Sequence, residues 1–274
     1  MELQRMVLVV CCVLSLSAAE GVIKLPDNET FPALILFGDS IIDTGTNNYV
    51  ANTLVTCDFP PYGRDFMGGT PTGRFSNGKV PSDFLGTPRS QPSDLLNGVN
   101  FASGGTGYDP LTAHLVSVVS LPEQLEQFKK YSENLKGNFG ESKTNFILSK
   151  GLVLVVSSSN DIANTYFATG ARKLQYDIPS YTDMLVQTAS SFVKELYESG
   201  LRRIGVFGAP PLGCLPFLRT LFGGLQRICV EEINMASKLF NSKLSSELQN
   251  LNQSLPQAKV DLKLMTEDAA AQEP

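Results

Sequence analysis

The sequence lacks a long apolar run and an excess of basic charge, and it contains a single histidine, His114. No stretch offers the roughly eighteen consecutive apolar residues that a membrane-spanning helix requires, so we expect no transmembrane anchor. The 22 basic residues are outnumbered by 27 acidic ones, which gives a net charge of −5. Without basic clusters, this balance gives no electrostatic basis for a nucleic-acid partner. We also expect no metal ion and no other cofactor.

The composition is that of a folded protein. Hydrophobic residues make up 42% of the chain, which is enough to bury a sizeable core and excludes a disordered protein. The length is compatible with one large α/β domain. No internal repeat and no low-complexity linker divides the sequence.

The N-terminal segment 1–19 has the pattern of a secretory signal peptide. Arg5 precedes a short apolar run from Met6 to Leu16, and the small residues Ser17-Ala-Ala19 follow. A basic residue, an apolar core and small residues at the cleavage point are typical of such signals. We therefore expect the mature chain to start near Glu20 and to be secreted into the extracellular space.

Two glycosylation sequons fit this export. They are Asn28-Glu-Thr30 and Asn252-Gln-Ser254. Sequons of this kind lie on the surface of secreted proteins, so we expect glycans at Asn28 and Asn252.

Cysteine is scarce once the signal is removed. Of five cysteines, Cys11 and Cys12 leave with the signal peptide, and an odd number remains in an oxidising compartment. Cys214 and Cys229 flank a loop that contains two glycines, which favours them as the disulfide pair. Cys57 would then be free or paired with another chain.

The body of the sequence alternates strand patterns with helix patterns. Short apolar runs predict strands at 33–37, 99–102, 152–157 and 204–208. Helix patterns follow at Leu121–Phe128, with Ser120 and Glu123 as a capping box, at Tyr181–Ser199, closed by Gly200, and along an apolar stripe from Ile233 to Leu251. This alternation predicts a mostly parallel sheet with right-handed crossovers and helices on both faces, a three-layer α/β/α fold.

Polar residues follow three of these strands, at the edge of the sheet where ligands bind in such folds. The first loop carries Ser40 after Gly38-Asp39, the second is Ser103–Gly107, and the third is Ser157–Asp161. Ser40 could expose its hydroxyl near a helix N-terminus, or it could be only an N-cap. The glycines and Asn160 could likewise form no more than a tight turn and an Asx-turn. The glycine loop lacks the spacing and the ending of a phosphate-binding loop.

A series of motifs resembles the plant GDSL esterase/lipases, a branch of the SGNH hydrolases, and within them the extracellular-lipase group. The motifs are Phe37-Gly-Asp-Ser-Ile-Ile-Asp-Thr-Gly-Thr-Asn-Asn-Tyr49, Pro60-Pro-Tyr-Gly63, Pro71-Thr-Gly-Arg-Phe-Ser-Asn-Gly-Lys79, Gly98-Val-Asn-Phe-Ala-Ser-Gly-Gly105, Asn160-Asp-Ile162 and Gly208-Ala-Pro-Pro-Leu-Gly-Cys214. The resemblance implies a flavodoxin-like α/β/α fold and a small ester or lipid substrate. It further implies that Ser40 is the nucleophile and that Gly104 and Asn160 donate to the oxyanion.

The sequence departs from the family pattern at three places. Ser158 stands where the family usually has glycine, which would strain a turn that needs positive φ. The segment between Asp83-Phe-Leu-Gly86 and Gln91-Pro-Ser-Asp-Leu95 is shorter than in the family. The family's catalytic aspartate and histidine, three residues apart near the C-terminus, have no counterpart here, and His114 has no carboxylate spaced as its partner.

The expected domain is therefore an incomplete hydrolase domain over 20–260, with a divergent tail at 261–274. One reading is a secreted serine ester hydrolase. The alternative is a catalytically impaired, truncated form that acts as a binding protein or has no function. In that form a partner chain could cover apolar surface left open by the missing end of the sheet. A flavodoxin-like nucleotide binder has only the glycine loop in its favour.

Overall fold

The computed structural model describes residues 31–84 and 96–263. The expected signal peptide at 1–19, the sequon at Asn28, the segment 91–95 and residues 264–274 of the expected tail lie outside the described residues.

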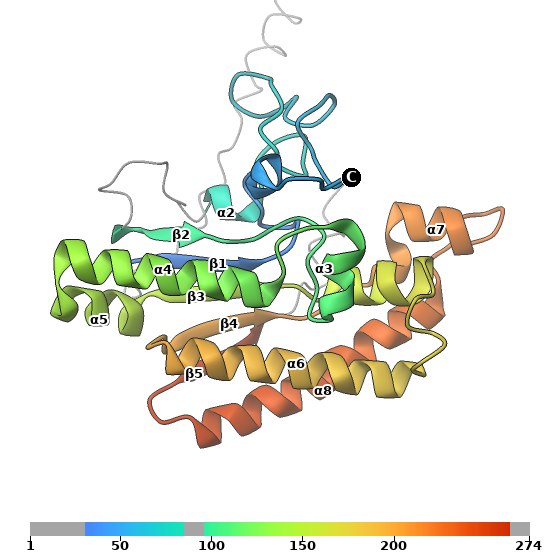
Figure 1. The fold of residues 1–274 in the computed structure, drawn as a ribbon. Coiled ribbons are helices and arrows are strands. Elements are labelled where there is room, and N and C mark those ends of the chain that lie inside the picture. Colours follow the sequence, from blue (N-terminus) through green and yellow to red (C-terminus); the bar gives the residue numbers. More distant parts are fainter. Residues whose placement is uncertain (1–30, 85–95, 264–274) are drawn as a thin grey trace, which may run out of the picture. The chain divides into compact units, whose positions relative to one another are not determined.

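A five-stranded sheet forms the centre of the fold (Figure 1). Its strands are β1 (Leu34–Gly38), β2 (Gly98–Asn100), β3 (Leu152–Val156), β4 (Arg203–Phe207) and β5 (Lys259–Lys263). They are ordered β2-β1-β3-β4-β5 and every pair is parallel. The four strands expected from apolar runs are thus confirmed, as is the parallel α/β class. Because the strands are parallel, the segments that follow them all leave from one edge of the sheet.

The fifth strand was not expected from the sequence. β5 pairs with β4 from Lys259, opposite Arg203, to Lys263, opposite Phe207, and so crosses the expected domain end at residue 260. Its charged and apolar residues alternate, and Val260 is its one fully buried side chain, so no apolar run marks it. The side-chain amide of Asn252, at the end of α8 (Glu231–Ser254), bonds both the N–H and the carbonyl of Val260. The expected glycosylation residue therefore also fixes this edge strand.

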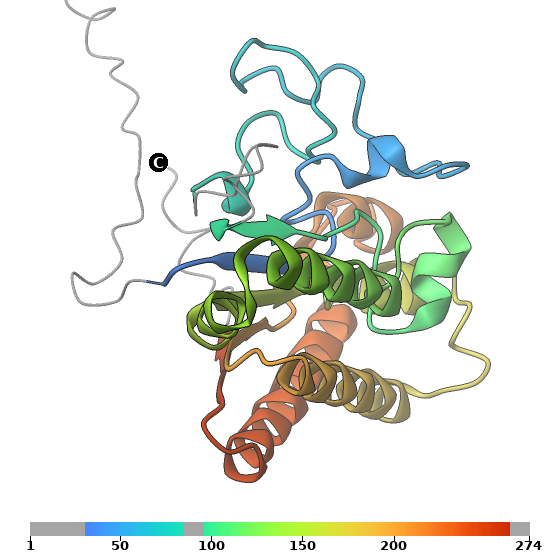
Figure 2. The ribbon, with the colours of Figure 1, turned by 60° about the vertical axis from the view of Figure 1, so that its left-hand side comes forward.

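The four longest helices contribute to the main hydrophobic core. They are α4 (Leu121–Phe139), α5 (Glu141–Lys150), α6 (Ile178–Glu198) and α8. They bury the sheet face that carries Ile35, Phe37, Val153 and Val155, and α6 and α8 lie side by side (Figures 1 and 2). The rings of Phe101, Phe128 and Phe192 surround Phe37 at centroid distances of 5.3, 5.7 and 5.5 Å.

The helix signals in the sequence are confirmed with small shifts. The capping box of α4 forms between Ser120 and Glu123. α6 begins three residues earlier than expected, because the carboxylate of Asp177 accepts from the N–H of Ser180 and so caps the helix.

The opposite face of the sheet carries a smaller hydrophobic cluster built on Leu34, Leu36, Leu154 and Val156.

The cysteines pair as expected, with a disulfide between Cys214 and Cys229. It joins the short helix η4 (Leu212–Cys214) to the loop that follows α7 (Pro216–Phe222). Cys57 is free and buried. Within the part of the chain that the structure describes, no helix is long and apolar enough to cross a membrane.

Candidate active site

The end of β1 is fixed from two sides before the chain reaches Ser40. Gly38 has φ +146°, and a Cβ on it would lie 1.9 Å from the carbonyl oxygen of Val156 on β3. From the other side, the buried amide of Gln124 on α4 accepts from the N–H of Gly38 at 2.8 Å and donates to its carbonyl at 2.9 Å. Only glycine fits at this position, and Gln124 bonds both its backbone N–H and its carbonyl.

Ser40 stands on a turn and not at the start of a helix. The N–H groups of Ile42 and Asp43 both donate to the carbonyl of Asp39, which closes a tight turn around Ser40. The expectation of a nearby helix N-terminus was therefore wrong, and so was the N-cap alternative. The local reason is that Asp39 itself binds the N–H of Ile41 through its carboxylate, which favours a turn over a helix. Ser40 is half-buried.

Two buried side chains join the Ser40 loop to the glycine loop. Asp43 accepts from the N–H of Gly45 and of Thr46, both at 2.7 Å, and from that of Gly104 at 2.9 Å. Asn47 donates to the carbonyl of Gly104 at 2.8 Å. The N–H of Gly104, which the sequence analysis assigned to an oxyanion, is thus directed at the Asp43 carboxylate.

Asn160 follows β3 and is held in one orientation. Its Nδ2 donates to the carbonyl of Thr106 at 2.9 Å, and its Oδ1 accepts from Asn164 Nδ2 at 2.9 Å. An amide nitrogen carries two protons, so one N–H of Asn160 remains for another acceptor. Asn164 lies one turn further on, in the π-helix η3 (Asp161–Ala168). Ser158 does not have positive φ, so the serine does not strain the turn.

Ser40 and Asn160 line one cavity of about 210 Å³. Gly105, with φ +96°, lines it in place of Gly104. The remaining lining residues are mostly apolar or threonine: Val55, Phe75, Thr112, Leu115, Val116, Asn164, Thr165 and Thr169. The loops after β1, β2 and β3 thus meet around one space, as expected from parallel strands.

Two buried carboxyl groups adjoin residues that line this cavity, because Asp39 precedes Ser40 and Asp161 follows Asn160. Burial raises the pKa of Asp39 to about 7, and the neighbouring charge of Asp161 adds to the rise. Burial likewise raises the pKa of Asp161 to about 7, against the bonds that it accepts from Thr112 Oγ1 and from the N–H of Tyr108 and Asp109. Those three bonds fix the start of α3 (Pro110–Val116), which forms one wall of the cavity. Within the described residues, Oδ2 of Asp39 has no hydrogen-bond partner.

An ion pair holds α3 from its other side. Asp109 caps the helix through the N–H of Leu111 and binds Arg172 at 2.6 and 2.7 Å. Burial alone would raise the pKa of Asp109, but the charge and bonds of Arg172, together with the bonds from Leu111 and Tyr181, outweigh burial and hold that pKa below its usual value. The position of α3 is therefore set by two carboxylates, Asp109 and Asp161.

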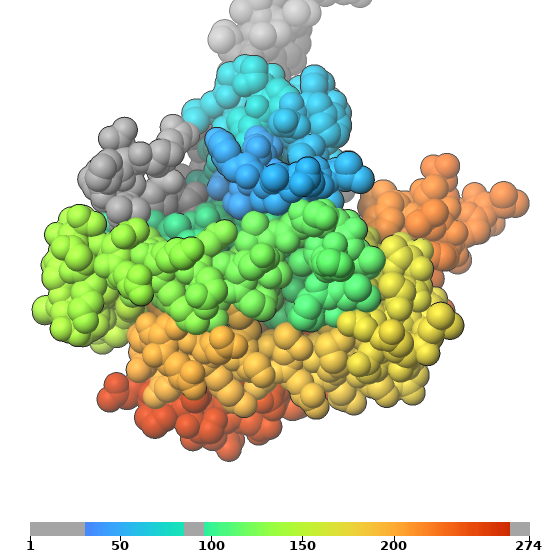
Figure 3. Space-filling view, in the orientation of Figure 1, coloured from blue at the N-terminus to red at the C-terminus, as the bar shows by residue number. Residues whose placement is uncertain are grey.

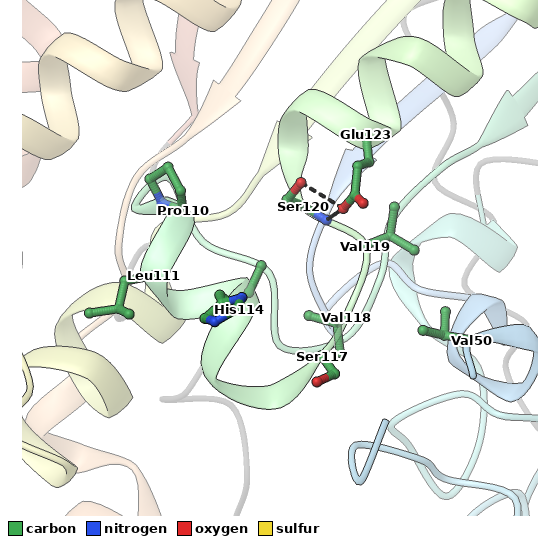
Figure 4. Close-up of a pocket in the computed structure, with 10 residues that line it drawn as sticks. Val50, Pro110, Leu111, His114, Ser117, Val118, Val119, Ser120 and Glu123 are labelled. Carbon is green, nitrogen blue, oxygen red and sulfur yellow. Dashed lines mark hydrogen bonds between the residues drawn. The ribbon is translucent and has the colours of Figure 1, made fainter. Parts of the chain in front are cut away.

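His114 is on the other side of α3 from the Ser40 cavity. It is exposed and lines a second, larger cavity of about 820 Å³ together with Leu111, Val118, Ser120 and Glu123 (Figure 4). The residues of α3 that line the Ser40 cavity are Thr112, Leu115 and Val116 instead. The one histidine of the chain is thus not placed to act on Ser40. In the described ranges, no group of three or more His, Cys, Asp or Glu side chains could hold a metal ion.

Comparison with known proteins decides the family. The family model of GDSL-like lipase/acylhydrolase matches residues 34–272. The chain belongs to this family. The matched residues extend past residue 260, the point at which the sequence motifs predict that the resemblance ends.

The curated relatives are plant proteins of the same family. GDSL esterase/lipase At5g42170 of Arabidopsis thaliana is 51% identical over 256 residues, which cover 89% of this chain and 68% of the relative. GDSL esterase/lipase At3g14820 is 54% identical over 240 residues, 83% of this chain and 67% of the relative. GDSL esterase/lipase EXL3 is 49% identical over 260 residues, 90% and 71% of the two chains. At3g14820 and EXL3 are also proteins of Arabidopsis thaliana.

Sequence reasoning missed several residues that build the GDSL-family site. Gln124 carried a signal, because it is a polar residue on the buried face of α4. Asn47 and Asp43 lie inside the first motif but have no apolar or catalytic pattern of their own. Asn164 follows Asn160 by four residues, which is one helical turn, and this spacing was the available signal.

Proposed function

We propose that this chain, by its family a carboxylic ester hydrolase of the GDSL type, attacks the ester carbonyl with the hydroxyl of Ser40. The observation that carries the proposal is that Ser40, Gly105 and Asn160 line the same cavity. Attack on the ester carbonyl places negative charge on its oxygen, and donors aimed at that oxygen lower the barrier. The second N–H of Asn160 is one donor suited to this role.

The glycine loop supplies the other donor. The resemblance assigns this role to Gly104, whose N–H bonds Asp43 Oδ2 at 2.9 Å. Gly105 lines the cavity, which favours its N–H over that of Gly104. Asp43 and Asn47 would then act by holding the loop in place. The apolar walls formed by Val55, Phe75, Leu115 and Val116 suit the acyl part of an ester.

A second candidate function rests on the position of His114. Ser40 needs a base to accept its proton, because the neutral hydroxyl is a weak nucleophile. His114 lines a different cavity, so this chain of 274 residues brings no histidine to Ser40. We therefore propose slow turnover by this protein, and a binding role in which esters occupy the cavity without rapid cleavage.

Hydrolysis of p-nitrophenyl butyrate tests both proposals. We expect slow release of nitrophenolate that Ser40→Ala abolishes, because oxyanion donors alone leave about 10³–10⁴-fold catalysis over water in a serine protease without its triad. Ser142→Ala, an exposed serine on α5, is the matched control and should retain the full rate. Ordinary enzyme rates that His114→Ala destroys would show that His114 is the base after all.

We further propose that the protein is secreted and glycosylated. The support is the signal-peptide pattern at 1–19 and the two sequons at Asn28 and Asn252. Asn252 keeps one amide proton for its bond to Val260 when the other is replaced by a glycan. Expression in a plant secretory host should yield a chain that lacks Met1 and loses mass on glycosidase treatment. Recovery inside the cell, with Met1 present and no glycan, would refute this proposal.

A further inference from the structure

The disulfide-closed segment 214–230 exposes an unusual number of large apolar side chains. Leu225 is 105% exposed, and Leu221 and Ile228 are each 60% exposed. The full set is Phe217, Leu221, Phe222, Leu225 and Ile228. Leu174 and Phe146, by contrast, are each exposed singly, Leu174 in the turn before α6 and Phe146 on α5. Contiguous exposed apolar side chains mark interaction sites, whereas single ones need no explanation.

The exposure is built into a fixed structure. Leu218 on α7 is fully buried and anchors the helix, so that its neighbours Phe217, Leu221 and Phe222 face outwards. The side chain of Arg219 donates to the carbonyl of Arg227, which closes the loop against the helix, and the disulfide closes the base. In the space-filling view this segment, in orange, stands out from the neighbouring helices (Figure 3).

The charge of the segment differs from that of the rest of the chain. Segment 214–230 contains two arginines, Arg219 and Arg227, and no acidic residue, whereas the whole chain has a net charge of −5 and the exposed Glu231 and Glu232 follow the segment directly at the start of α8. Aromatic and aliphatic side chains beside basic ones are the combination that binds the surface of an anionic bilayer. We propose that segment 214–230 docks this protein on an anionic phospholipid surface.

The segment lies at the same edge of the sheet as Ser40, so docking would also affect the position of the candidate site. It follows β4, so it leaves the sheet at the same edge as Ser40, which follows β1. α7 also contacts η3, whose Asn164 and Thr165 line the Ser40 cavity. Docking through 214–230 would hold this edge of the sheet against the lipid surface. The docking itself does not depend on the proposed function, because it requires no turnover.

Co-sedimentation with lipid vesicles tests the proposal. The protein, expressed in a secretory host, should bind vesicles of phosphatidylcholine mixed with phosphatidylglycerol more tightly than vesicles of phosphatidylcholine alone. Phe222→Asp and Leu225→Asp should each lower the partition coefficient at least tenfold. Phe146→Asp, the same substitution on α5, is the matched control and should bind like the wild type. Arg227→Gln should weaken binding to the anionic vesicles about fivefold, as expected for one basic residue, and leave the neutral ones unchanged.

The outcomes separate docking from catalysis. Ser40→Ala should bind vesicles like the wild type, so that loss of hydrolysis and loss of docking are distinguishable. No binding to either vesicle, or equal losses in Phe222→Asp and Phe146→Asp, would overturn the proposal. A dimer in sedimentation velocity that Leu225→Asp dissociates would also overturn it, because a second copy of the chain would then cover the segment.

Discussion

The position of Ser40 depends on Gln124, and replacing this residue with methionine tests that dependence. Met fills a similar volume but makes neither bond to Gly38. The carbonyl of Gly38 keeps the N–H of Ser103 at 2.9 Å as a donor, so that loss destabilises by about 0.5–1.5 kcal/mol. The N–H of Gly38 is left buried without its partner, which costs about 1–3 kcal/mol. We expect Gln124→Met to lower the free energy of unfolding by about 3 kcal/mol.

Urea unfolding followed by circular dichroism measures this change, and thermal unfolding should show a fall in Tm of about 6–12 °C. Gln127→Met, on the exposed side of the same helix, is the matched control and should change the free energy of unfolding by less than about 0.5 kcal/mol. If both variants unfold at the same urea concentration as the wild type, the bonds to Gly38 do not stabilise the end of β1. Ser40 would then not depend on Gln124 for its position.

Three further predictions concern the same region. Asp39 has a pKa raised to about 7, so its contribution to stability is complete below about pH 4 and is lost as the pH rises through 7; Asp39→Asn should therefore unfold at higher urea than the wild type at pH 8, and an unchanged pH profile would contradict this. Gly38→Ala should yield little folded protein, because its Cβ would lie 1.9 Å from Val156 O; a soluble variant with wild-type Tm would show that β3 can move away. Asn160→Ala should lower the slow esterase rate by about 10²–10³ and Asn164→Ala by about tenfold with KM unchanged, whereas a loss confined to KM would assign Asn164 to substrate binding.

Most of the fold followed from the sequence, because buried parallel strands are unbroken apolar runs. β1 and β3 are such runs, and the caps of α4 and the stop at Gly200 have local chemical signatures. β5 did not follow, because an edge strand with one buried side chain resembles a polar loop. The turn at Ser40 did not follow either, because its geometry is set by the Asp39 carboxylate, and nothing local distinguishes that arrangement from a helix cap.

The sequence identified residues that line the candidate site but not the residues that hold them in position. Ser40 and Asn160 were identified by position after strands and by family motif, and both line the cavity. The sequence motif pointed to Gly104 and gave no reason to consider Gly105, because the difference between them depends on the long-range bond from Gly104 to Asp43, 61 residues away. Gln124 is 86 residues from Gly38. Sequence patterns report local periodicity, so they do not predict contacts between residues that lie 61 or 86 positions apart in the chain.

Mass spectrometry after incubation with p-nitrophenyl butyrate tests the central claim most directly. The claim is that Ser40 is the nucleophile and that the cavity has its donors but no histidine base. We expect a butyryl group on the peptide that contains Ser40, formed slowly, and formed faster when free imidazole is added as a base. His114→Ala should acylate like the wild type, and Ser40→Ala should carry no butyryl group at this position. Equal acylation of the Ser40→Ala chain at another residue, or acylation of Ser40 that requires His114, would contradict the account.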